Sequence, residues 1–210
     1  MKRILLADDH VLVRKGLKET LESEFGRIKF GDAENAAQAL ELATSEEWDL
    51  VMLDINMGEG RSGLEIMEDI RTIQPDVPVL VLSMYPVSDF AVRALKLGAA
   101  GYISKQSAYE ELVTAVKTVL EGNRYISAAL AERLADDLQS KTEKPHETLS
   151  TREYQVMRMI ATGKNLKEIA AELSISAKTV GTYHLRIFQK MGLKNDIELT
   201  RYVLFNKLLD

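Results

Sequence analysis

The chain has 210 residues, of which 46% are apolar and 28% charged, a balance typical of a globular protein and long enough for two small domains. It contains no cysteine, which excludes disulfides and thiolate metal sites. No apolar run approaches the roughly 18 residues of a membrane helix, and no signal peptide precedes the first predicted strand, so we expect a cytoplasmic protein without a membrane partner.

The net charge of −5 is divided unevenly along the chain. Residues 146–210 hold 10 Lys or Arg and 7 Asp or Glu, a net charge of +3. The other 17 basic and 25 acidic residues give 1–145 a net charge of −8. This division favours a nucleic-acid contact confined to the C-terminal part.

Five apolar runs in the N-terminal part predict buried strands, and helical periodicity fills the gaps between them. Capping signatures at Asn35, Ser62 and Ser107 mark three of the helix starts. Alternating strands and helices predict a parallel sheet covered on both faces. The domain built on this sheet is expected to span residues 1–122. The predicted strands are Ile4–Ala7, Ile28–Asp32, Leu50–Asp54, Val79–Ser83 and Ala100–Ser104.

Charged residues stand at the ends of three of these strands. Asp8 and Asp9 follow the first strand, Asp54 ends the third, and Lys105 follows the fifth. In an open α/β sheet the ligand site lies outside the carboxyl ends of the strands. Three carboxylates there would repel one another unless a hard cation lay among them. The pattern therefore predicts a small acidic Mg²⁺ pocket beside one ammonium group.

In this order the residues resemble the receiver domain of a two-component response regulator. The matching positions are the acidic pair, the aspartate after the third strand, a serine after the fourth and the lysine: Asp8, Asp9, Asp54, Ser83 and Lys105, with Tyr102 three residues before the lysine. The resemblance implies a flavodoxin-like, doubly wound, five-stranded parallel sheet. It also implies that a partner histidine kinase phosphorylates Asp54.

The same resemblance assigns roles to the other residues of the pocket. Mg²⁺ would be held by Asp8, Asp9, Asp54 and the backbone carbonyl of Asn56. Lys105 would pair with the phosphoryl group, while Ser83 and Tyr102 would act as the switch.

The loop after Asp54 departs from the usual receiver pattern. Gly58 replaces a common proline, and Gly63 lies nine rather than eight residues beyond the aspartate, which indicates one inserted residue. Glycine increases backbone freedom where proline would restrict it. We therefore expect the run Gly58-Glu59-Gly60 to affect the lifetime of the acyl phosphate and the docking of the kinase, while metal binding through the side chains is unaffected.

Residues 123–147 are predicted to be a linker that contains a helix at about 127–139. Leu130, Leu134 and Leu138 form a stripe along that helix. The polar run that follows, interrupted by Pro145, is typical of an interdomain connection and includes His146.

Residues 148–210 have helical periodicity throughout, which predicts a small all-α domain. Ser150 begins one helix with Glu153 at the capping-box position. Further helices are predicted over 167–173, 177–191 and about 196–206. The third of these four helices is expected to bury a stripe made of Val180, Tyr183, Ile187 and Met191.

This C-terminal string resembles the LuxR-type helix-turn-helix. The matching segments are Leu149-Ser150, Arg152-Glu153, Lys167-Glu168-Ile169-Ala170, Ile175-Ser176, Lys178-Thr179-Val180 and Lys190-Met191-Gly192-Leu193. With the receiver in front, nearly the whole chain resembles the NarL/FixJ class of response regulators. The resemblance implies promoter DNA as partner and a homodimer on that DNA.

The helix 177–191 presents polar and cationic residues opposite its apolar stripe, as expected of a recognition helix. We assign phosphate contacts to Lys178, Thr179 and Lys190, and base contacts to Thr182 and Leu185. The complete candidate DNA-binding set adds two neighbours: Lys178, Thr179, Thr182, His184, Leu185, Arg186 and Lys190. For the DNA-bound dimer surface we expect the fourth helix, with Leu199, Tyr202 and Val203.

These features together predict a DNA-binding transcription regulator controlled by phosphorylation, and not an enzyme. A haloacid-dehalogenase-type phosphatase would need a second acid two residues after Asp54, where this chain has Asn56. The remaining alternative is a DNA-binding regulator whose receiver works without phosphorylation, as a dimerisation or protein-interaction module.

Overall fold

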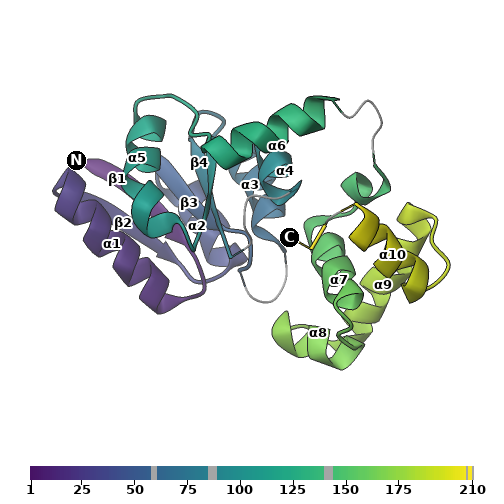
Figure 1. Cartoon of the computed structure of the whole chain (residues 1–210). Helices are drawn as coiled ribbons and strands as arrows, with labels where there is room; N and C mark the ends of the chain where they lie inside the picture. The colour runs from purple at the N-terminus through teal and green to yellow at the C-terminus, as the bar shows by residue number, and fades with distance from the viewer. Residues whose placement is uncertain (58–60, 85–88, 140–143, 207, 210) are drawn as a thin grey trace. The chain divides into compact units, whose positions relative to one another are not determined.

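In the computed structural model the chain forms two compact units, residues 1–135 and 136–210 (Figure 1). The structure describes residues 1–57, 61–84, 89–139, 144–206 and 208–209. The altered loop residues Gly58, Glu59 and Gly60 lie outside the described residues.

The first unit is built on a five-stranded parallel sheet in the order β2-β1-β3-β4-β5. This is the strand order of a flavodoxin-like doubly wound sheet, so the predicted fold class is confirmed. The central strands β3 and β4 are buried at every residue, which explains their continuous apolar runs. The strands are β1 Lys2–Ala7, β2 Ile28–Ala33, β3 Leu50–Asp54, β4 Val79–Ser83 and β5 Gly101–Ser104.

Helices cover both faces of this sheet. One face is closed by α1 (Val11–Phe25) and α5 (Ala108–Leu120), whose buried leucines and valines pack on alternate residues of the strands. The remaining helices are α2 (Ala36–Ser45), α3 (Gly63–Ile73) and α4 (Asp89–Lys96), with α2 packed beside α3 and α4 against β5 (Figure 1).

Two of the three predicted helix caps in this unit are confirmed. The Asn35 side chain accepts from the backbone of Gln38, and Ser62 forms a reciprocal capping box with Glu65. Ser107 does mark the start of α5, as predicted, but it is not a side-chain cap: its backbone is already helical and its side chain makes no cap bond. Its hydroxyl instead lies 3.0 Å from that of Ser104.

The predicted connecting helix is present as α6 (Ala128–Gln139), and the division between the two compact units falls within it. Of its leucine stripe, Leu130 is buried and Leu134 half-buried.

The second unit is helical, as predicted. A short 3₁₀ turn, η1 (Pro145–Thr148), precedes α7 (Thr151–Ala161), α8 (Leu166–Glu172), α9 (Ala177–Met191) and α10 (Asp196–Phe205). Capping by Ser150 and Glu153 is confirmed, and α8 and α9 pack together across a tight turn as a helix-turn-helix. Tyr183, expected in the buried stripe of α9, is only half-buried.

His146 does not behave as a linker residue. It is 2% exposed, and its Nδ1 lies 2.8 Å from the hydroxyl of Tyr202 on α10. The sequence placed His146 in the linker because polar neighbours surround it, but the η1 turn holds its ring against the helices of the second unit.

Candidate phosphoacceptor pocket and nucleic-acid interface

The acidic pocket lies at the carboxyl ends of β1 and β3, the two strands at which the order of the sheet reverses. Asp8 follows β1 and Asp54 is the last residue of β3, and both are buried. Lys105, directly after β5, places Nζ 2.6 Å from Oδ2 of Asp8 and 2.7 Å from Oδ2 of Asp54. The topology thus brings together three groups that are up to 97 residues apart in sequence.

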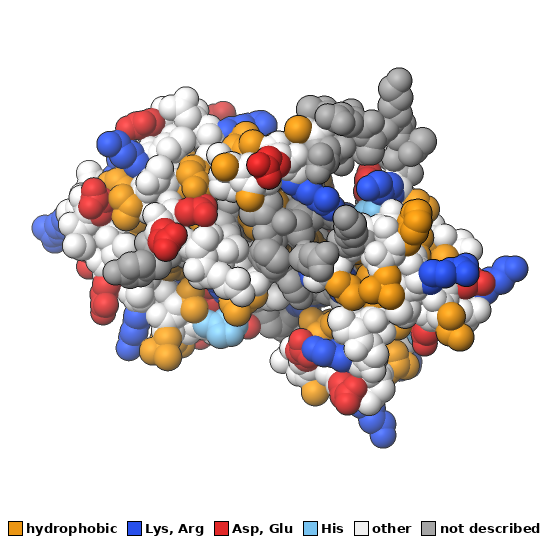
Figure 2. Space-filling view, in the orientation of Figure 1, with side chains coloured by type: hydrophobic (Ala, Val, Ile, Leu, Met, Phe, Trp, Pro, Cys, Tyr) orange, Lys and Arg blue, Asp and Glu red, His pale blue; other side chains and the backbone are white. Residues whose placement is uncertain are grey.

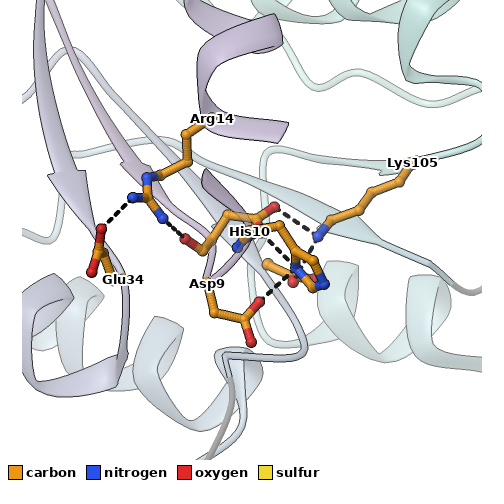
Figure 3. Close-up of polar contacts among 7 residues, drawn as sticks. Asp9, His10, Arg14, Glu34 and Lys105 are labelled. Carbon is orange, nitrogen blue, oxygen red and sulfur yellow. Dashed lines mark hydrogen bonds and ion pairs between the residues drawn. The ribbon is translucent and has the colours of Figure 1, made fainter. Parts of the chain in front are cut away.

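Further ligand atoms lie beside these three groups. Oxygen or nitrogen atoms of Asp8, Asp9, His10 and Asp54 lie within 4.8 Å of one another. Nδ1 of His10 is 2.7 Å from Asp9 Oδ1 and 3.1 Å from Asp8 Oδ1 (Figure 3). Oδ1 of Asp54 is buried and has no hydrogen-bond partner among the described residues. Three carboxylates, one with an unsatisfied buried oxygen, fit a hard cation such as Mg²⁺.

Burial and neighbouring charges perturb both members of the central ion pair. Burial raises the pKa of Asp54 to about 6, and the nearby Asp8 carboxylate adds to the rise while Lys105 opposes it. For Lys105, burial works against the charged form, but the two carboxylates outweigh it and raise the pKa of the ammonium. The lysine therefore stays charged and favours ionisation of Asp54.

The loop after Asp54 returns to the pocket at Gly63, the first residue of α3. A Cβ atom at this position would lie 2.0 Å from the carbonyl oxygen of Asp54, a distance that only glycine avoids. The Gly63 amide donates to the carbonyl of Ile55 at 2.9 Å. Gly63, which lies one residue farther from Asp54 than in the usual receiver pattern, is therefore the residue through which α3 contacts the end of β3.

The two expected switch residues are both buried. Ser83 ends β4, and its carbonyl accepts a hydrogen bond of 2.6 Å from the amide of Lys105. Tyr102 in β5 is completely buried. Asn56, the expected carbonyl ligand, is half-buried two residues after Asp54.

In the second unit, α9 exposes most of the candidate DNA-binding residues. Lys178, Thr182, Leu185 and Arg186 are exposed, and Leu185 is 66% exposed although it is apolar. Thr179 is half-buried, and its amide is capped by Ser176. No ion pair to Lys178 occurs within the described parts of the chain.

Two other residues of the set are held by neighbouring elements. Nζ of Lys190 lies 2.6 Å from the buried carboxylate of Glu153 and 3.3 Å from the carbonyl of Thr148. Nε2 of His184 lies 2.6 Å from Oδ1 of Asp196, the first residue of α10. Sequence reasoning missed both contacts because each joins helices that pack together only in the tertiary structure.

Two of the three residues expected to form a dimer surface on α10 do not lie at the surface of the second unit. Leu199 and Val203 are completely buried in the second unit, and Tyr202 bonds to His146. Leu199, Tyr202 and Val203 were expected to form the dimer surface because of their apolar spacing along the helix. The same spacing is found in a stripe that faces the core. The exposed apolar residues are Ile197, Leu204 and Phe205, which are 80%, 60% and 86% exposed.

A receiver-like α/β unit with an acidic pocket, followed by a helix-turn-helix, defines a DNA-binding response regulator. Two family models match the chain: "Response regulator receiver domain" over residues 4–117 and "Bacterial regulatory proteins, luxR family" over 147–203. Response regulator UvrY of Escherichia coli K12 is 37% identical over 202 residues, covering 95% of this chain and 92% of UvrY. Response regulator GacA of Pseudomonas aeruginosa is 36% identical over 214 residues, covering 100% and 99%.

A solved structure of two RcsB dimers bound to two parallel DNAs matches with a TM-score of 0.60 and 25% identity, over 96% of this chain and 97% of RcsB. The chain therefore belongs to the NarL/FixJ class of two-component response regulators. This is a class of transcriptional regulators and not of classical enzymes. No described helix is long and apolar enough to cross a membrane.

One buried residue beside the pocket escaped the sequence reasoning. Arg14 in α1 is 5% exposed and shares the inward face of its helix with Leu17 and Leu21. The sequence did contain a signal for its burial, because Arg14 has the helical spacing of the buried leucines of α1.

Proposed function

We propose that Asp54 accepts a phosphoryl group from a partner histidine kinase and that this modification strengthens dimerisation and promoter binding. The observation that carries the proposal is the convergence of Asp8, Asp54 and Lys105 at the carboxyl edge of the sheet. An oxygen of Asp54 would form a bond to phosphorus as the nitrogen–phosphorus bond of the kinase's phosphohistidine breaks. The electron pair of that bond remains on the imidazole.

Each residue of the pocket has a role in this transfer. Asp8, Asp9, Asp54 and the backbone carbonyl of Asn56 would hold Mg²⁺, which when bound would neutralise the negative charge of the phosphoryl group. Lys105 already pairs with Asp54 and would follow the new charge onto the phosphoryl oxygens.

The same group would bias a switch at β4 and β5. Ser83 would donate its hydroxyl to a phosphoryl oxygen and draw its loop toward Asp54, and Tyr102 would turn into the space that the loop leaves. The backbone bond from Lys105 to Ser83 joins the two strand ends that would move. A two-state element of this kind couples sites by about 1–3 kcal/mol.

On DNA, we propose a homodimer paired through the exposed side of α10. Ile197, Leu204 and Phe205 line a groove with Ile160 of α7, and apolar side chains on a water-facing helix are typical of an interaction site. Figure 2 shows hydrophobic side chains at the surface of the second unit among lysines and arginines. A two-fold pair would read half-sites about 10 base pairs apart.

The phosphorylation step is tested by incubating the whole chain with acetyl phosphate and Mg²⁺ and measuring its intact mass. We expect a gain of about 80 Da for one phosphoryl group in the wild type and none in Asp54→Asn. An unchanged wild-type mass would favour the phosphorylation-independent alternative. A gain retained in Asp54→Asn would place the acceptor elsewhere.

The dimer surface is tested by sedimentation of the protein bound to duplex DNA. We expect Phe205→Asp to convert the complex with two protein copies into one with a single copy. Ile73→Asp is the matched control, because Ile73 is an exposed apolar residue of α3 in the other unit. Two bound copies of Phe205→Asp would exclude this face.

A further inference from the structure

Arg14 places a buried guanidinium group directly behind the acidic pocket. Its Nη1 donates to the backbone carbonyl of Asp8, and its Nη2 lies 2.5 Å from Oε1 of Glu34. Its Nε lies 3.4 Å from Oδ1 of Asp32. Figure 3 shows the guanidinium lying between Glu34 and the chain at the end of β1.

The pairing of this cation is asymmetric. Burying a guanidinium costs several kcal/mol unless its donors are satisfied. The side chains of Asp32 and Glu34 are 41% and 57% exposed, so they balance the charge while they remain hydrated. The carbonyl of Asp8, by contrast, belongs to a residue that is 1% exposed. Of the three partners of Arg14, only the Asp8 carbonyl, which belongs to the backbone of the pocket, is therefore buried.

The peptide groups on both sides of Asp8 are held in this way. Its amide donates to the carbonyl of Ala33 at 3.0 Å, and its carbonyl accepts from Arg14. With both peptide groups fixed, the Asp8 carboxylate is directed to the position 2.6 Å from Nζ of Lys105. The direction of the following residues, Asp9 and His10, begins at the same carbonyl.

We propose that Arg14 is a positioning residue that sets the metal affinity of the pocket by fixing the backbone of Asp8, an inference that rests on the proposed function. Arg14 touches neither Asp54 nor the expected metal ligand atoms of the side chains. Groups of this kind, which orient metal ligands from behind, typically change metal affinity by about 10- to 100-fold when they are replaced.

The test is a calorimetric titration of the whole chain with Mg²⁺ alone. Arg14→Lys keeps the positive charge but loses the planar fork that reaches the Asp8 carbonyl and Glu34 together. We expect it to bind Mg²⁺ at least about tenfold more weakly than the wild type. Urea unfolding in the absence of Mg²⁺, followed by fluorescence of the single tryptophan, Trp48, checks that the receiver unit remains folded.

Arg71→Lys is the matched control. Arg71 also donates from Nη1 to a backbone carbonyl, that of Leu97 at 2.7 Å, but it lies beside Pro78, which precedes β4, at the opposite edge of the sheet. We expect its Mg²⁺ affinity to equal that of the wild type. If Arg71→Lys lost as much Mg²⁺ affinity as Arg14→Lys, the effect would follow from weakening any arginine that bonds to a backbone carbonyl. That result would overturn the proposal.

A second variant decides the question if Arg14→Lys does not fold. Glu34→Gln leaves the guanidinium in place and changes a side chain that is more than half exposed. Because the guanidinium loses one of its partners, we expect Mg²⁺ binding to weaken by about two- to fivefold. If Arg14→Lys does fold, adding Glu34→Gln to it should cause little further loss of affinity, because the two residues act as one unit.

Wild-type Mg²⁺ affinity in folded Arg14→Lys, or in Glu34→Gln where Arg14→Lys does not fold, would overturn the role of Arg14 and leave the proposed function intact. A wild-type chain that itself binds no Mg²⁺ would overturn both.

Discussion

The acidic pocket and the recognition helix differ in what holds their functional groups in place. In the pocket, Asp8, Asp54 and Lys105 are attached to the ends of buried strands, and their side chains are nearly or completely buried. On α9, most of the candidate contacts are exposed side chains of one helix, and two of the set, His184 and Lys190, are bound to other elements of the second unit.

This difference separates two kinds of functional group. A pocket built on strand ends is set by the topology of the sheet, so a change to its frame is expected to alter both stability and chemistry. A helix that binds its ligand at an exposed surface uses one set of residues to contact the ligand. A different set, here called the frame, holds the helix against neighbouring elements. On α9, we propose that Lys178, Thr182 and Leu185 form the DNA contact surface, while His184 and Lys190, which bind Asp196 and Glu153, belong to the frame.

The largest effect is expected from Gly63→Ala. The added Cβ would lie 2.0 Å from the Asp54 carbonyl, so α3 or β3 must shift, at a cost of about 3 kcal/mol in the free energy of unfolding. Gly16→Ala in α1 is the matched control: apart from its chain neighbours and the backbone of its own helix, no atom lies within 4 Å of the added Cβ, and alanine stabilises a helix interior by up to about 1 kcal/mol. Urea unfolding followed by Trp48 fluorescence measures both. A neutral Gly63→Ala would show that the frame of the pocket is not rigid.

On the recognition helix, we expect Thr182→Ala and Leu185→Ala each to weaken binding to a preferred duplex by about 2 kcal/mol, because both side chains are exposed and small enough to reach base edges. Binding to a scrambled duplex should hardly change. Fluorescence anisotropy with both duplexes measures the difference. Equal losses on the two duplexes would remove these residues from base reading.

Lys190→Met tests the frame of the same helix. Burial alone would raise the pKa of Glu153, but hydrogen bonds from Lys190 and the Ser150 backbone outweigh it and lower this pKa. Removing the half-exposed lysine should destabilise the second unit by about 1–2 kcal/mol, since solvent screens part of the interaction.

The same pair gives a pH dependence with a defined sign. A lowered folded-state pKa contributes stability that is present above the ordinary value of 4.5 and is lost as the pH falls through the folded-state pKa. The difference in unfolding free energy between wild type and Lys190→Met should therefore shrink below about pH 4.5. Circular dichroism follows the helices of both units and Trp48 fluorescence reports the receiver alone, so a transition seen only by circular dichroism belongs to the second unit. A difference that does not change with pH would exclude this pair as its cause.

The smallest effect is expected from Lys178→Met. Lys178 is exposed at the first turn of α9, where the backbone amides also favour a phosphate. Its loss should weaken preferred and scrambled duplexes alike and flatten the log–log salt dependence by about 0.9. We expect Lys190→Met to change that slope less, because its ammonium already binds Glu153. Equal slopes for the two variants would contradict the division between frame and contact surface.

The sequence predicted what depends on periodicity and on chain order. Buried runs located β3 and β4 to the residue, and the order of strands and helices implied that Asp8, Asp54 and Lys105 would meet. The boundaries of α9 were correct because Ser176 and Gly192 are strong local end signals.

What the sequence could not supply depends on contacts between elements. Leu199 and Val203 have the spacing of any apolar stripe, and only the packing of α10 shows that they face inward. A polar residue such as His146 is most often exposed, and its polar neighbours gave no local sign of its burial. The contact between Lys190 and Glu153 spans 37 residues and arises only when α9 packs against α7.

The most direct test of the account is the affinity of the whole chain for DNA before and after treatment with acetyl phosphate and Mg²⁺. Coupling of about 1–3 kcal/mol predicts that the wild type binds a preferred duplex about 5- to 150-fold more tightly after treatment. Asp54→Asn should bind equally in both conditions. Wild-type protein that carries the phosphoryl group by mass, yet binds DNA no more tightly than the untreated protein, would contradict the account.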